Sequence, residues 1–132
     1  MTDKKKKVIT LLVIYIIGVI IIMCGIYLNE KNKEIKNVIS QYSLTNEEIS
    51  IINNGFNENT TYLNDIMNIS KKVDFYMVIN RINNGNKPID YRGNIDFTDK
   101  EIKKIINSLN INDELVKNFY ILQKDFSNYR YN

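Results

Sequence analysis

The stretch VITLLVIYIIGVIIIMCGIYL, from Val8 to Leu28, contains 21 residues and no charged side chain. As an α-helix, which rises about 1.5 Å per residue, it would be about 31 Å long and would match the hydrocarbon core of a bilayer. Because a helix satisfies its own backbone hydrogen bonds, such a segment is stable in lipid. The stretch therefore predicts one transmembrane helix at residues 8–28, between a basic tail at 1–7 and a small domain at 29–132.

The lysines around this stretch predict its orientation. Four of them precede it directly and three follow it soon after: Lys4, Lys5, Lys6 and Lys7, then Lys31, Lys33 and Lys36. Positively charged flanks tend to stay in the cytoplasm. We therefore expect a cell-membrane protein with a cytoplasmic N-terminus and an extracytoplasmic C-terminal domain.

The end of the apolar stretch indicates an uncleaved signal anchor. It is longer than the apolar region of a typical signal peptide, and no Ala or Ser lies near its end. Lipidation at Cys24 is an alternative, but Met23 stands where such signals place a small residue. Cleavage by another route is a further alternative.

Gly18 and Gly25 lie seven residues apart and so fall on one face of the predicted span. Small residues let two transmembrane helices approach closely, and a homo-oligomer held by this face is one interpretation. The four-residue spacing of the better-known motif is missing, so we favour two incidental glycines.

The net charge of +3 comes entirely from the tail, where Lys4–Lys7 stand against Asp3. From Asn29 onward 14 basic and 14 acidic side chains balance. A nucleic-acid-binding domain would show a basic excess, so we expect no nucleic-acid partner. The chain has no Ala, His or Trp and is rich in Ile, Asn, Lys and Tyr. This composition indicates an AT-rich genome, of a low-GC bacterium or one of its phages.

The residue inventory excludes several chemistries. With no His and with Cys24 as the single cysteine, the usual zinc sites and the Ser-His-Asp and Cys-His nucleophilic systems are ruled out. The five glycines are scattered, so no phosphate-binding loop is present. Glu47/Glu48 and Asp113/Glu114 are better explained as charges at helix starts. We therefore expect no enzyme, and no catalytic, cofactor or metal site.

Several signals predict helices after the span. The helix should continue through 29–42, where Ile35, Val38, Ile39 and Tyr42 form one face. Thr45 and Glu48, and likewise Thr98 and Glu101, fit capping boxes. The first of these helices should end near Gly55 with Ile49 and Ile52 inward, and the second should bury Ile102, Ile105, Ile106 and Leu109. Asn112 can cap a last helix with a face of Leu115, Phe119, Leu122 and Phe126.

The middle of the domain permits two interpretations. Residues 59–72 predict a helix with a stripe of Tyr62, Leu63, Ile66, Met67 and Ile69. At 73–80 apolar and polar residues alternate, Asn84-Gly85 follows as a hairpin turn, and 87–97 offers a return strand. The alternative continues the helix to Ile82 through Ile69, Val73, Tyr76 and Met77. We expect the hairpin, which gives a mostly α domain with a small β-hairpin.

Two functions fit these expectations. The first is a single-pass membrane protein whose domain binds a protein partner, and so scaffolds or regulates an envelope or secretion complex. The alternative is a phage or mobile-element protein of holin-like or immunity type that acts on the membrane itself. A resemblance of layout to small envelope and phage proteins does not choose between them.

Overall fold

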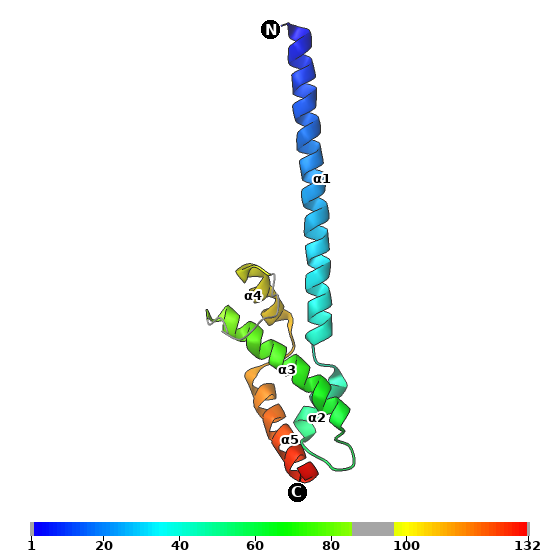
Figure 1. Cartoon of the computed structure of the whole chain (residues 1–132), viewed down its shortest axis with the longest axis vertical. Coiled ribbons are helices and arrows are strands. Elements are labelled where there is room, and N and C mark those ends of the chain that lie inside the picture. The colour runs from blue at the N-terminus through cyan, green and yellow to red at the C-terminus, as the bar shows by residue number, and fades with distance from the viewer. Residues whose placement is uncertain (1, 86–96, 132) are drawn as a thin grey trace. The chain divides into compact units, whose positions relative to one another are not determined.

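The computed structural model describes residues 2–85 and 97–131, and in these two ranges it contains helices and no strand (Figure 1). The helices follow one another along the chain as α1 (Asp3–Tyr42), α2 (Asn46–Asn54), α3 (Leu63–Asn83), α4 (Asp99–Ser108) and α5 (Asp113–Tyr131). The prediction of a mostly helical chain with a long apolar N-terminal helix is confirmed. The chain divides into two compact units, Met1–Lys36 and Asn37–Asn132, and we call the second the helical unit.

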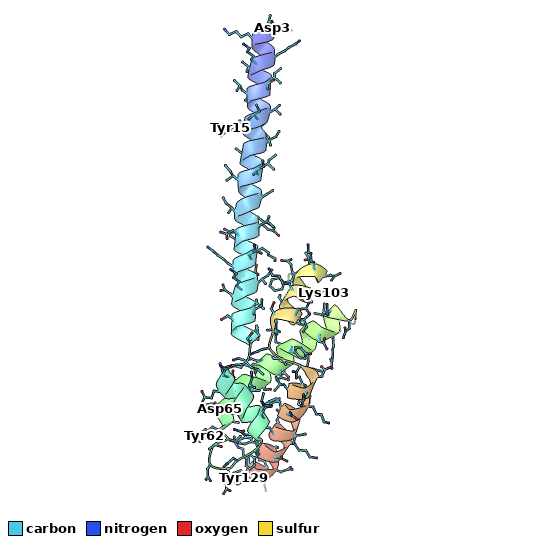
Figure 2. The ribbon with its side chains drawn as sticks, turned by 180° about the vertical axis from the view of Figure 1, so that it is seen from behind. Asp3, Tyr15, Tyr62, Asp65, Lys103 and Tyr129 are labelled. Atoms are coloured by element: carbon cyan, nitrogen blue, oxygen red, sulfur yellow. The ribbon has the colours of Figure 1, made fainter. Side chains whose placement is uncertain are left out.

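In the first unit, α1 is continuous through the apolar stretch, and its side chains stand outward on all sides around Tyr15 (Figure 2). Large apolar residues such as Leu11, Ile21 and Tyr27 are exposed. A window of 18 residues has a mean hydropathy of 3.0, and none of it is buried. By length and composition α1 is therefore able to cross a membrane, a property that anchors and signal sequences share.

The capping signals place the starts of α2, α4 and α5. Thr45 accepts a hydrogen bond from the Glu48 N–H, and Glu48 Oε1 accepts one from the Thr45 N–H at 2.9 Å. Thr98 and Glu101 form the same reciprocal pair at α4. Asn112 Oδ1 accepts from the Leu115 N–H at 2.8 Å at the start of α5. The predicted end of α2 is also confirmed, because Gly55 follows it with a φ of +74°.

The predicted β-hairpin is wrong in its first strand, because α3 runs without a break from Leu63 to Asn83. Its buried residues are spaced by three and four, which is the period of a helix: Ile66, Ile69, Val73, Tyr76 and Ile79. The predicted return strand covers 87–97, of which 87–96 lie outside the described residues. Asn84-Gly85 forms the turn that ends α3.

The alternation of apolar and polar residues at 73–80 was misleading, because Val73 and Ile79 fit both the two-residue period of a strand and the period of a helix. No proline or glycine interrupts 63–83, so a helix that begins at Leu63 has no reason to stop before Asn84. The predicted stripe of 59–72 is right for Ile66 and Ile69. It is wrong for Tyr62, Leu63 and Met67, which are exposed.

The core of the helical unit is built where α4 packs on α3 and α5 packs on α2 (Figure 1). The most deeply buried side chains are all apolar: Ile52, Ile69, Val73, Ile79, Ile105, Phe119 and Leu122. Phe119 and Leu122 confirm the predicted face of α5, to which Val116 must be added, while Leu115 and Phe126 are half-buried. Phe56 holds the end of this helix, with its ring 5.1 Å from that of Tyr129.

Candidate binding groove

The groove of interest lies entirely within the helical unit, between the end of α1, the start of α2 and one face of α3. It has a volume of about 700 Å³. Helix α1 contributes Gln41 and Tyr42 at its last turn. The remaining lining residues come from the α2 region and from α3: Thr45, Glu47, Glu48, Ile51, Asp65, Asn68, Lys71, Lys72, Asp74, Phe75 and Val78.

An ion pair joins the two sides of the groove. Lys72 Nζ donates to Glu48 Oε1 at 2.5 Å, and the two side chains are 17% and 11% exposed. The same oxygen accepts from the Thr45 N–H. Glu48 therefore completes the cap of α2 and also binds α2 to α3, so that the wall of the groove is fixed by one carboxylate.

The pKa of the Glu48 carboxyl reflects its contacts with both Thr45 and Lys72. Burial is the largest single influence and by itself would raise the pKa of the carboxyl. The hydrogen bonds from Lys72 and Thr45 and the positive charge of Lys72 together outweigh burial. They hold the pKa of Glu48 below its usual value of 4.5, so the carboxylate is charged at neutral pH.

An aromatic pair forms another part of the wall. The rings of Tyr42 and Phe75 are stacked with centroids 3.8 Å apart and planes 11° apart. Both side chains are half-buried and line the groove. The pair fixes the last turn of α1 against α3 and offers aromatic surface to whatever enters the groove.

Asn110 fixes the loop between α1 and α2 from the opposite end of the sequence. Its Oδ1 accepts from the Leu44 N–H at 2.8 Å, and its Nδ2 donates to the Leu44 carbonyl at 2.7 Å. The amide thus imitates the pairing of a neighbouring strand and satisfies both backbone groups of Leu44. Thr45, which lines the groove, comes directly after this fixed residue.

Tyr76 and Asp113 make a comparable link between α3 and α5, outside the groove. The Tyr76 hydroxyl donates to Asp113 Oδ1 at 3.3 Å. Burial, then the negative charge of Asp113 and this hydrogen bond, raise the pKa of Tyr76 above its usual 10.0. Asp113, predicted as a charge at a helix start, therefore has a second role in tertiary structure.

The candidate site residues predicted from the sequence, which are two glycines and the basic tail, belong to the first unit. Gly18 and Gly25 are on α1, where a Cβ built on either would meet no atom within 4 Å. The basic tail, Lys4–Lys7, is exposed in the first turns of α1. Neither group is among the residues that line the groove, and the proposed helix–helix contact and the topology signal stay predictions.

The groove itself was not predicted. Glu47 and Glu48 were interpreted only as charges at a helix start, and the sequence assigned no role to Lys71 or Lys72. Within the two described ranges, no three His, Cys, Asp or Glu residues are grouped so that they could hold a metal ion. The groups that face the groove are carboxylates, amides, ammonium groups and aromatic rings, which are suited to non-covalent binding.

Comparison with known proteins adds no relative to these observations: no family model, curated protein or solved structure matches this chain.

Proposed function

We propose that this chain is a non-catalytic binding protein held at the cell membrane by α1, and that its helical unit captures a protein partner in the groove between α2 and α3. The N-terminus would be cytoplasmic and the helical unit extracytoplasmic. The partner would belong to an envelope or secretion complex of a bacterium or of a phage-infected cell.

The observation that carries this proposal is the groove and its rigid construction. An ion pair, a capping box, an aromatic stack and the amide of Asn110 all fix its walls. A preformed site binds without having to order its own side chains first. A volume of about 700 Å³ is within the usual range for binding clefts.

The proposal can be tested with a photo-crosslinking amino acid in the full-length chain, expressed in its own cells. The label would replace Ile51, which lines the groove, and in a control would replace Asn107, which is exposed on α4. We expect a discrete crosslinked protein species from Ile51 and none from Asn107. A chain that inserts normally and yields no species specific to Ile51 would overturn the proposal.

The proposed location needs its own test. Ser127 is exposed near the end of α5 and can be replaced by cysteine in a chain that also carries Cys24→Ser. A thiol reagent that does not cross membranes should label this cysteine in intact cells. Labelling that occurs only after lysis would show that the helical unit is cytoplasmic.

A further inference from the structure

We infer that the occupant of the groove is a peptide segment of the partner that carries several Lys or Arg side chains. This inference rests on the proposed function and specifies its partner. It follows from the charges that the groove leaves unpaired, from their spread along α3, and from the aromatic pair beside them.

The groove is acidic although the whole chain carries a charge of +3. Its lining contains two lysines and four carboxylates, and one lysine and one carboxylate neutralise each other in the Lys72–Glu48 pair. The described residues make no ion pair with the other three carboxylates, which are faced by Lys71 alone within the lining. These three are Glu47, Asp65 and Asp74.

Helix starts explain part of this charge, because Glu47 and Asp65 lie in the first turns of α2 and α3. Asp74 has no such explanation, since it lies in the middle of α3 and is exposed. A negative potential in a groove with protein walls is stronger than the same charges would produce on an open surface. The groove is therefore complementary to cations.

The spread of the carboxylates favours a chain of cations over a single ion. Asp65 and Asp74 are nine residues apart on α3, which separates them by about 13.5 Å along the helix axis and by about half a turn around it, so the axial spacing is only part of their separation. No three acidic residues in the described part of the chain are close enough together to hold a metal ion. An extended peptide advances about 13 Å in four residues, so lysines at every fourth position would have a comparable spacing.

The aromatic pair supplies the apolar part of such a site. Lys and Arg side chains lay their aliphatic stems along apolar surface and place their charge over aromatic faces. The Tyr42–Phe75 stack lines the groove together with Ile51 and Val78. A cationic side chain that enters can therefore pack its stem as well as pair its charge, which an acidic or purely apolar peptide could not do.

The probe for this inference is a nine-residue peptide with lysine at positions one, five and nine and with serine and glycine between them. The full-length chain is held in zwitterionic micelles, so that the peptide is not attracted to the lipid. Binding is followed by amide chemical shifts of α2 and α3. A peptide with glutamate in place of lysine and the polyamine spermidine serve as the comparison ligands.

We expect the lysine peptide to shift amides around the groove and the glutamate peptide to leave them unchanged. The double variant Asp65→Asn, Asp74→Asn should bind about three- to thirty-fold more weakly, as the loss of two exposed ion pairs implies. The matched variant Asp125→Asn, which removes an exposed carboxylate from α5, should bind as the wild type does. Added salt should weaken the wild type more than the double variant.

Three results would overturn the inference: no shifts with the lysine peptide, equal affinity of the double variant, or tighter binding of spermidine than of the peptide. None of them touches the proposed function, because a crosslink from Ile51 would still show a partner in the groove. Conversely, absence of that crosslink would remove the proposed function whatever the peptide does.

Discussion

Ile16 in α1 and Ile79 in α3 both lie in helices, but one side chain is exposed and the other is buried. Ile16 in α1 is 54% exposed, whereas Ile79 in α3 is fully buried. The described part of α1 between Val8 and Leu28 buries no side chain, and α3 buries five. In water an apolar helix without a covering partner would be unstable, so under the proposed function lipid covers α1, as the other helices of the unit cover α3.

The difference separates two causes of helix formation. Away from its two ends, α1 pairs its backbone groups within the helix, and a bilayer would make that requirement absolute. The short helices α2 and α4, with 9 and 10 residues, are below the length at which an isolated helix is stable in water. They depend on caps and on the packing of a few isoleucines. Changes of the same kind in the two units should therefore have different consequences.

The largest expected effect is the loss of a buried isoleucine. Ile79→Ala should lower the free energy of unfolding of the helical unit by about 2–5 kcal/mol, because it leaves a cavity between α3 and its neighbours. Ile16→Ala makes the same chemical change in α1 and should leave that free energy unchanged. Urea titration of the full-length chain in micelles, followed by tyrosine circular dichroism, would measure both. If Ile16→Ala lowered the free energy of unfolding as much as Ile79→Ala, the side chain of Ile16 would have to be packed as closely as that of Ile79.

A smaller effect is expected from the ion pair in the groove. Lys72→Met leaves the Glu48 carboxylate without its charged partner and should cost about 1–3 kcal/mol at neutral pH. Lys71→Met removes the neighbouring lysine, which is exposed, and should cost much less. The measurement is the urea midpoint of each variant. If Lys71→Met costs as much as Lys72→Met, the pair does not fix the wall of the groove.

The Lys72–Glu48 ion pair also predicts that the stability of the helical unit depends on pH. Because the folded chain lowers the pKa of Glu48, the stabilisation by the ion pair is fully present above the usual pKa of 4.5, which the unfolded chain has. It is lost as the pH falls through the lower pKa of the folded chain. The difference between wild type and Lys72→Met should therefore shrink below about pH 4. A difference that stays constant down to pH 2 or so would contradict the assignment of the lowered pKa to this pair.

Local signals in the sequence were sufficient for much of the fold. The capping boxes at Thr45 and Thr98 and the cap at Asn112 involve residues three apart, so their geometry follows from the sequence once a helix forms. The wrong hairpin shows where local signals conflict, since Val73 and Ile79 fit both a strand and a helix. The absence of any helix stop between Leu63 and Asn83 was the better guide there.

The groove depends on pairs that no local pattern contains. Glu48 and Lys72 are 24 residues apart in the sequence, and Leu44 and Asn110 are 66 apart. A charged pair and an amide carry no periodicity, and many other lysines and asparagines in this chain could have served equally well. Such contacts are determined by how α2 and α3 pack, and this packing became visible only in the three-dimensional structure.

The smallest expected effect compares two threonines. The Thr98 hydroxyl accepts from the Glu101 N–H and caps α4, whereas the Thr10 hydroxyl donates to the Lys6 carbonyl within α1. Thr98→Ala leaves a helix-start N–H without its partner and should cost about 1 kcal/mol, seen as faster amide exchange throughout α4. Thr10→Ala removes a bond to a carbonyl that the helix already satisfies, so exchange in α1 should not change. If exchange in α4 were equally unaffected, α4 would be stabilised by its packing on α3 alone, and local capping would matter as little there as it does in α1.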